Sequence, residues 1–202
     1  MDEIVTTSQM RERFVAYFSK FATLSDAEKD GIRKGANIQV FPKGTILLKE
    51  TEVNKRVFFI LKGCVRQYHM IDGEEKSANF FTEEQWVLSL NSQGQNAPAG
   101  FFCDCVDDCI LMVATADEYN PMYDAFPRFE TISRLILEKE FSYQQEIQMS
   151  YVTDTAEQRY LKLLNLKSDL INRVPQYQLA SYIGVKPETL SRIRRRIAAK
   201  RK

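Results

Sequence analysis

Residues 174–197 have the sequence VPQYQLASYIGVKPETLSRIRRRI, which predicts two short helices joined by a tight turn. Gly184 lies between the two predicted helices, and glycine readily adopts the positive φ that such a turn requires. Pro187 fits the first turn of the second helix, because its fixed φ suits that position and it has no N–H to satisfy. The stretch therefore predicts a helix-turn-helix.

The predicted helices have one apolar and one polar face. Apolar side chains at helical spacing are expected to point inward, and they are Leu179, Ala180, Ile183, Leu190, Ile193 and Ile197. The polar side chains predicted to contact DNA are Gln176, Lys186, Glu188, Thr189, Ser191, Arg192, Arg194, Arg195 and Arg196. A helix that buries its apolar face and exposes its polar face can enter a major groove, and this pattern favours that interpretation. The alternative is a helical hairpin that is basic without contacting DNA.

Arginine chemistry assigns roles within this polar face. Arginine donates two parallel hydrogen bonds to guanine O6 and N7, and glutamate accepts one from cytosine N4. Arg192 is the residue that we expect to contact a base, with Glu188 beside it. Phosphate contacts, which set register without carrying sequence information, are expected from Arg194, Arg196, Lys200, Arg201 and Lys202.

The distribution of charge supports a nucleic-acid partner. The whole chain of 202 residues has a formal net charge of +1. Residues 186–202, however, hold eight lysines and arginines against one glutamate, while the rest of the chain holds 20 basic and 26 acidic residues. A basic block at one end is typical of a protein that binds the phosphate backbone. A solvated basic tail is the alternative.

Composition excludes several classes of protein. Hydrophobic residues at 44% and charged residues at 27% are ordinary for a folded globular chain. The N-terminus begins Met1-Asp2-Glu3-Ile4, with acid where a signal peptide needs base, and no apolar run approaches the roughly 20 residues that span a bilayer. These features predict a cytoplasmic protein with no membrane partner.

The middle of the chain contains short β-rich runs that predict strands. Strands are predicted at Asn37–Phe41, Thr45–Leu48, Val57–Leu61, Val65–Met70, Ser77–Phe81, Phe101–Val106 and Ile110–Thr115. Glycine and proline turn signals separate them, and helices are expected before them at residues 8–22 and from Ser25 onward. The fold class is therefore α+β, with an antiparallel β jelly roll in the N-terminal part.

A long helix is predicted at residues 127–150. Its apolar residues form a stripe too long for a small domain to cover, and they are Phe129, Ile132, Leu135, Ile136, Phe141 and Ile147. Such a helix commonly buries its spare face against a second copy of the chain, which predicts a homodimer. Packing against its own roll is the alternative. The predicted domains are then residues 1–126, the helix at 127–150 and a helical unit at 151–202.

At this point the residues resemble those of the Crp/Fnr regulators. Glu188-Thr189-Leu190-Ser191-Arg192 is similar to the recognition core of that family. Two upstream stretches, at residues 41–46 and 57–65, resemble the opening strands of its cyclic-nucleotide-binding roll. The resemblance implies a bacterial-type transcription regulator with a sensor roll, a dimerisation helix and a winged helix-turn-helix. Its implied partners are double-stranded DNA, a second copy of the chain and RNA polymerase.

Two features depart from the family pattern. Ser89 stands where the family's nucleotide binders have the glutamate that meets the ribose, and Ala99 or Gly100 stands near the position of the arginine that meets the cyclic phosphate. Lys76 is the only lysine or arginine between Arg66 and Arg128. The roll is therefore not expected to bind cyclic AMP in the family's way.

The second departure is the wing. Only residues 168–173 separate the helix that is capped near Thr155 from the helix-turn-helix, and this is too short for a two-stranded hairpin. We therefore expect the DNA-binding unit to be winged-helix-like with a reduced wing.

Other candidate sites give weaker signals. An apolar ligand pocket is predicted at Trp86, Ser89, Ala99 and Phe101, for an effector that is unknown or absent. Three thiols, those of Cys103, Cys105 and Cys109, either pack as small apolar groups or act on a metal or redox signal. Ordinary packing is favoured, so no metal and no cofactor are predicted.

Catalysis is not expected. Jelly-roll enzymes usually hold a metal with two or three histidines, and this chain has only His69. No phosphate loop or nucleophile elbow occurs in the sequence. The alternative to a DNA-binding regulator is a cupin-like protein that binds a small molecule or a partner and does not bind DNA.

Overall fold

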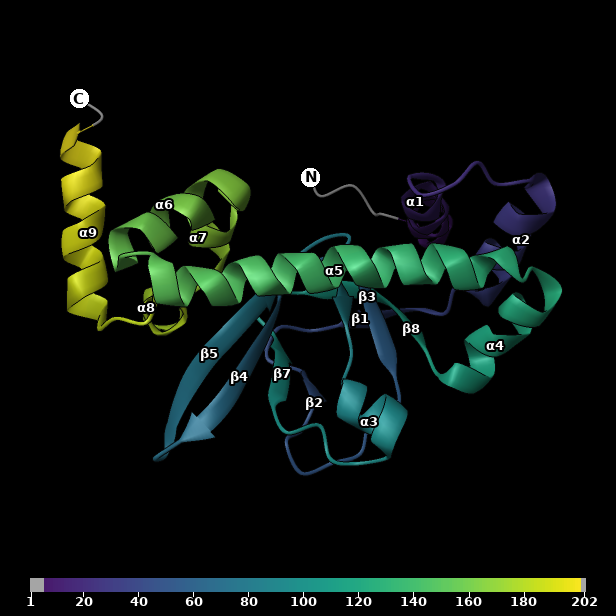
Figure 1. Ribbon diagram of the computed structural model, residues 1–202, viewed down its shortest axis with the longest axis horizontal. Coiled ribbons are helices and arrows are strands. Elements are labelled where there is room, and N and C mark those ends of the chain that lie inside the picture. The colour runs from purple at the N-terminus through teal and green to yellow at the C-terminus, as the bar shows by residue number, and fades with distance from the viewer. Residues whose placement is uncertain (1–5, 201–202) are drawn as a thin grey trace.

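One long helix, α5 (Arg128–Thr153), spans the computed structural model, which describes residues 6–200. It runs across the whole length of the molecule, with the N-terminal helices at one end and the C-terminal helices at the other (Figure 1). The strands lie along one side of it. The position of α5 therefore sets the distance between the two groups of helices.

The elements follow the predicted order. The other helices are α1 (Thr7–Ser19), α2 (Asp26–Gly35), α3 (Leu90–Gln95), α4 (Ala116–Ala125), α6 (Ala156–Leu166), α7 (Leu170–Arg173), α8 (Gln176–Ile183) and α9 (Pro187–Lys200). The strands are β1 (Ile38–Phe41), β2 (Ile46–Leu48), β3 (Val57–Lys62), β4 (Val65–Ile71), β5 (Glu74–Phe81), β6 (Trp86–Val87), β7 (Phe102–Cys105) and β8 (Cys109–Ala114). All seven predicted strands form, whereas β6, α3, α4 and α7 were not predicted.

The strands form two antiparallel sheets. One has the order β1-β8-β3-β6 and the other the order β2-β7-β4-β5. Apolar side chains from both sheets fill the space between them, among them Leu48, Phe58, Ile60, Val65, Cys103 and Leu111. These strands, residues 38–114, are called the roll below. The α+β jelly-roll fold predicted from the sequence is confirmed.

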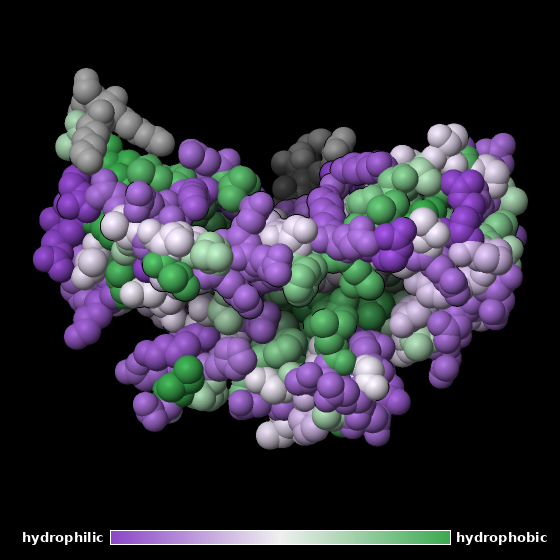
Figure 2. Space-filling model, viewed as in Figure 1, coloured by the Kyte–Doolittle hydropathy of each residue, from purple (hydrophilic) through white to green (hydrophobic). Residues whose placement is uncertain are grey.

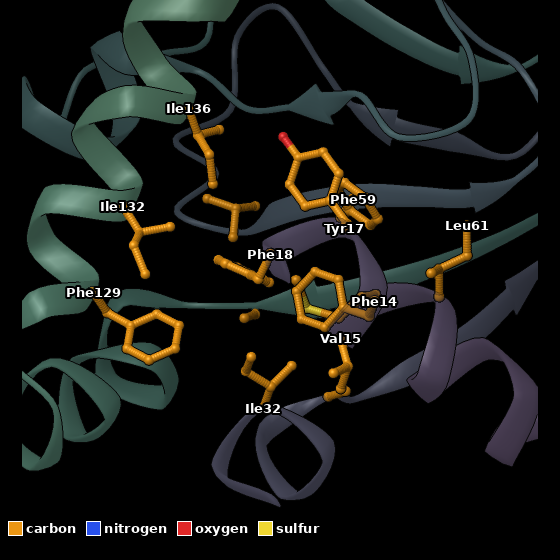
Figure 3. Packing of buried hydrophobic residues seen from close by; sticks show 14 of the residues in the cluster. Phe14, Val15, Tyr17, Phe18, Ile32, Phe59, Leu61, Phe129, Ile132 and Ile136 are labelled. Carbon is orange, nitrogen blue, oxygen red and sulfur yellow. The ribbon is translucent and has the colours of Figure 1, made fainter. Parts of the chain in front are cut away.

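A second core lies on the outer face of the first sheet. Tyr17 and Phe18 of α1 pack there against Phe59 of β3, with the Tyr17 and Phe59 ring centroids 4.5 Å apart. Ile132 and Ile136 of α5 close the cluster from the other side (Figure 3). Capping boxes at Thr6 and Ser25 fix the starts of α1 and α2. The cluster joins the N-terminal helices, the roll and α5 into one body.

The apolar stripe of α5 is divided between two environments. Phe129, Ile132 and Ile136 are buried at 2%, 3% and 5% exposure, so the first half of α5 packs against its own roll. In the second half, Phe141 is 64% exposed. The alternative of packing against the roll therefore holds for the start of the stripe, and burial of the remaining, spare face against a second copy stays a prediction.

Helices α6 to α9, residues 156–200, form the C-terminal unit. Its core contains every inward position predicted for the helix-turn-helix, from Leu179 to Ile197. Leu166 of α6 is 69% exposed and lies outside this core. The single turn of α7 occupies the place of a hairpin, and no strand follows β8 within residues 6–200. The reduced wing is confirmed.

Two glycines in turns of the roll test how closely it is packed. Gly44 and Gly63 both have positive φ, of 83° and 114°. A Cβ at Gly44 would meet nothing within 4 Å, whereas a Cβ at Gly63 would lie 2.5 Å from the Cys109 sulfur and 2.8 Å from its Cα. We expect Gly44→Ala to lower the free energy of unfolding by roughly 1–2 kcal/mol through backbone strain alone. Gly63→Ala should cost about 2 kcal/mol more through overpacking.

Urea denaturation of the two variants measures this difference. Gly44→Ala is the matched control, because it shares the backbone strain without the steric clash. Equal losses in the two variants would contradict the close approach of Gly63 to Cys109.

Candidate nucleic-acid interface

The turn between α8 and α9 has the conformation predicted from the sequence. Gly184 has a φ of 80° and ends α8, with its N–H donating to the carbonyls of Ser181 and Ala180. Pro187 then opens α9, and Leu190 is fully buried beneath it. The turn thus holds the two helices against a shared apolar core.

All nine residues predicted to contact DNA lie on one continuous segment, from the first turn of α8 to the third turn of α9. Thr189 and Ser191 are half-buried and the others are exposed. The amide of Gln176 donates to the Ser191 hydroxyl at 2.6 Å and to the Pro187 carbonyl at 3.3 Å. Arg192 donates to the Thr189 hydroxyl at 3.1 Å. The predicted site therefore contains its own hydrogen bonds, which position Ser191 and Arg192.

At least one basic side chain of α9 already has an ion-pair partner within the protein. Arg196, which was expected to hold a phosphate, forms an ion pair with Glu157 of α6 while its side chain remains 57% exposed. Arg194 and Arg195 are exposed. Arg201 and Lys202, also expected to hold phosphates, lie outside the described residues. The predicted role of Arg196 therefore requires a phosphate to compete with Glu157.

A partly buried cluster of ion pairs around Arg173, which was not predicted from the sequence, anchors the C-terminal unit to the roll. Arg173 of α7 donates to Asp107 at 2.8 Å and to Glu83 at 3.0 Å, and it also pairs with Asp169 at 3.0 Å. Asp107 lies between β7 and β8, and Glu83 follows β5. Because these partners are 66 and 90 residues away in the sequence, no local pattern indicates the contact.

Lys167 makes the second anchoring contact. Its ammonium donates to the Phe80 carbonyl at 2.7 Å and to the Gln85 side-chain oxygen at 2.9 Å. It also lies 5.3 Å from the centroid of the Tyr143 ring on α5. Burial lowers the pKa of Lys167 to about 8, against the partly compensating charges of Cys64 and Glu140.

A third contact joins α8 directly to β5. The Ser181 hydroxyl accepts a hydrogen bond from the Ser77 N–H at 3.0 Å, and the rings of Phe80 and Tyr182 meet edge to face at 5.3 Å. Lys186, in the turn before α9, helps to lower the pKa of Glu74, although the adjacent Lys76 has the larger effect. The helix-turn-helix is thus held against the second sheet of the roll.

The residues predicted to form a ligand pocket lie around one cavity of about 1040 Å³. Trp86, Ser89, Ala99 and Phe101 all line it, together with residues of α1, α2, α4 and α5. We call it the α5 cavity. Figure 2 shows apolar side chains gathered in a hollow in the middle of the molecule, below the course of α5 in Figure 1. Trp86 also donates to the Tyr17 hydroxyl at 3.2 Å, so it serves the core as well as the cavity.

The polar groups at the positions compared with the family's nucleotide-contacting residues already have hydrogen-bond partners. The Ser89 hydroxyl caps α3 by accepting from the Ser92 N–H. The backbone amides of Ala99 and Gly100 donate to carbonyls of Glu52 and Glu50 at 3.1 and 2.9 Å. These groups are therefore already engaged and offer no replacement for a guanidinium.

Arg66 is the nearest arginine in the sequence to this region, and its charge is already neutralised. Its guanidinium donates to both carboxylate oxygens of Asp104, at 3.0 and 2.8 Å, and to Glu75 at 2.7 Å. The side chain is only 3% exposed. Arg66 therefore belongs to the structure of the second sheet.

The cysteines pack as small buried side chains. Cys103 and Cys105 point to the same face of β7, as predicted, and Cys64 and Cys109 are also fully buried. Burial raises the pKa of the Cys103 thiol, which suppresses the reactive thiolate. Within residues 6–200 no group of three metal-ligating side chains comes together. The same residues contain no helix that is both long and apolar enough to cross a membrane.

Comparisons with known proteins agree with this architecture. Residues 38–125 match the model of the cyclic nucleotide-binding domain family. A comparison with curated proteins finds no match. Residues 38–125, which include the roll, are thus similar to cyclic nucleotide-binding domains, in agreement with the resemblance that the two upstream stretches suggested.

Solved structures of Crp/Fnr-type regulators share the fold of the whole chain. FixK2 from Bradyrhizobium japonicum is 15% identical with a TM-score of 0.69, and the match covers 82% of this chain and 85% of that one. The c-di-GMP responsive global regulator CLP of Xanthomonas campestris is 14% identical with a TM-score of 0.63, covering 96% and 92%. The Thermus thermophilus catabolite activator protein is 16% identical with a TM-score of 0.54, covering 89% and 86%. The chain thus has the fold of these regulators from the roll to the helix-turn-helix.

The buried ammonium of Lys167 predicts a pH dependence of stability. Its pKa is about 8 in the folded protein against 10.5 when unfolded, so the folded state loses this proton first as the pH rises. The free energy of unfolding therefore rises by about 3 kcal/mol from this group alone as the pH increases from 8 to 10.5. Denaturation of the native protein and of Lys167→Met across this range isolates the effect, because the other titrating groups are common to both. A difference that stays constant with pH would contradict the buried position of Lys167.

Proposed function

We propose that this chain is a transcription regulator that binds DNA as a homodimer, with α9 as the recognition helix. The observation that carries the proposal is the α8–α9 arrangement, in which a buried apolar face supports an exposed face bearing Glu188, Arg192 and Arg195. This geometry matches what a major groove admits and what base edges recognise. A protein with this role acts in the cytoplasm on RNA polymerase, and we infer no catalytic activity for it.

The second half of α5 supports the proposed dimer. Large apolar side chains are exposed along it, and they include Phe141 at 64%, Met149 at 60% and Val152 at 84%. Apolar surface that is continuous along one helix usually marks an interface. A two-fold contact between two copies of α5 would cover it and would place two α9 helices on one side of the dimer.

Selection of DNA sites from a random library with the purified full chain tests this function. The expected result is a palindrome whose half-sites lie 10–10.5 base pairs apart, about 34 Å, as required for two recognition helices on one face of DNA. Enrichment of a single half-site would contradict the dimer. No enrichment would leave the chain as a cupin-like binding protein that does not bind DNA.

Arg192→Ala tests which residue reads the sequence. Loss of a bidentate contact to guanine should cost roughly 1–3 kcal/mol on the selected site and should relax preference at one G·C pair in each half-site. Binding titrations on specific and random DNA measure both effects. Arg194→Ala is the matched comparison, since loss of a phosphate contact should weaken both kinds of DNA equally. An equal loss for Arg192→Ala on the two DNAs would remove it from the base-reading role.

The residues that line the α5 cavity predict that the protein does not bind cyclic AMP. The carboxylate and guanidinium used by the family's nucleotide binders are replaced by Ser89 and Ala99, and the local amides are already engaged. Calorimetry is therefore expected to detect no binding in the micromolar range. Micromolar or tighter binding, accompanied by a thermal shift, would overturn this expectation.

A further inference from the structure

The lining of the α5 cavity contains no cation. Among the described residues around it there is no lysine and no arginine, while three glutamates, Glu118, Glu138 and Glu140, face it beside the single histidine, His69. A cavity with this balance repels anions. Its chemistry is therefore opposite to that needed for a cyclic phosphate.

Only one of the three carboxylates is available to a ligand. Glu118 accepts hydrogen bonds from the N–H and hydroxyl of Thr115 at the start of α4. Glu138 pairs with Arg134 at 2.5 Å along the outer face of α5. Glu140 is half-buried, and no group within residues 6–200 donates a hydrogen bond to it. Burial raises the pKa of Glu140, as expected for a carboxylate that lacks a bound cation.

Nine aromatic residues contribute to the remaining wall. Among them are Phe14, Phe18, Trp86, Phe101 and Phe141. The faces of such rings attract organic cations, most strongly where water is excluded. The volume of about 1040 Å³ lies at the upper end of the range for small-molecule sites. The walls therefore favour a ligand with an apolar body of considerable size.

We propose that the α5 cavity binds a hydrophobic amine, with its ammonium against Glu140 and its apolar body among the aromatic rings. The ligand would neutralise the one carboxylate of the lining for which no hydrogen bond or ion pair is described, and its body would fill apolar space without displacing any hydrogen bond described above. An anionic ligand of the same shape would meet Glu140 without a compensating cation. Charge therefore selects the ligand more strongly than shape.

The position of Glu140 gives such a ligand a route to the C-terminal unit. Its charge acts on Lys167, which anchors that unit to the roll, as well as on the cavity. An ammonium bound at Glu140 would reduce its attraction for the ammonium of Lys167. This regulatory consequence rests on the proposed DNA-binding function, whereas binding of the amine does not.

Two matched sets of probes test the proposal on the full chain. Tryptamine, 3-methylindole and indole-3-acetate share one ring and differ in charge, and hexylamine and hexanoate form the aliphatic counterpart. Calorimetry and thermal shift should show binding of the amines at least tenfold tighter than of the carboxylates, with 3-methylindole in between. Equal or tighter binding of the carboxylates, or no binding of either amine, would overturn the proposal.

Glu140→Gln locates the charge contact. It should weaken tryptamine binding about tenfold and leave 3-methylindole unchanged, while Glu138→Gln, whose carboxylate is already paired, should change neither. If Glu140→Gln does not fold, Glu140→Asp retains the charge, shortens the reach and should give a smaller loss. Equal weakening of tryptamine and 3-methylindole would show a packing effect and would contradict the charge contact.

DNA binding without any probe separates this proposal from the proposed function. If the protein binds its selected DNA site but neither amine, the proposed DNA-binding function stands and the proposed amine ligand is wrong. A chain that binds tryptamine and enriches no DNA supports the ligand and refutes the regulator.

Discussion

The packing of α5 on the outer face of the roll is the contact on which the rest of the structure depends. Phe129, Ile132 and Ile136 bury one half of the helix among rings of α1 and β3. The same helix then continues beyond the roll and carries the C-terminal unit at its far end (Figure 1). Because a helix of 26 residues is stiff, a shift where it meets the roll is transmitted to that unit. The α5 cavity lies at this junction, so a ligand bound there would contact the helix that positions α9.

Elements defined by local patterns could be predicted from the sequence. The helix-turn-helix follows from a glycine at the turn, a proline at the next helix start and apolar residues at fixed spacing, all within 24 residues. The strands follow from β-rich runs bounded by turn signals. The very short β6 is too brief to give a periodic signal, and its assignment depends on pairing with Phe58 and Phe59. Its Trp86 was predicted as a pocket residue and proves to serve both the cavity and the core.

The contacts between the roll and the C-terminal unit could not be predicted in the same way. Lys167 and Arg173 have sequence neighbours that indicate only a solvated helix end. Their partners Gln85, Phe80 and Glu83 lie 82 to 90 residues away from them in the sequence, so only the folded chain brings these residues together. The availability of Glu140 is likewise a property of three dimensions, since it depends on which neighbouring carboxylates already have partners. Local sequence patterns thus predict the individual helices and strands, whereas the contacts between the roll and the C-terminal unit depend on the tertiary fold.

The ion pair between Arg196 and Glu157 has a consequence for how the proposed DNA complex would respond to salt. A phosphate that takes a free arginine releases condensed counterions from the DNA, and that release makes binding weaken as salt rises. A phosphate that takes Arg196 instead replaces the Glu157 carboxylate as the partner of a cation that is already paired. The exchange therefore releases fewer ions than the contact count suggests. The slope of affinity against salt would therefore understate how many phosphates the protein touches.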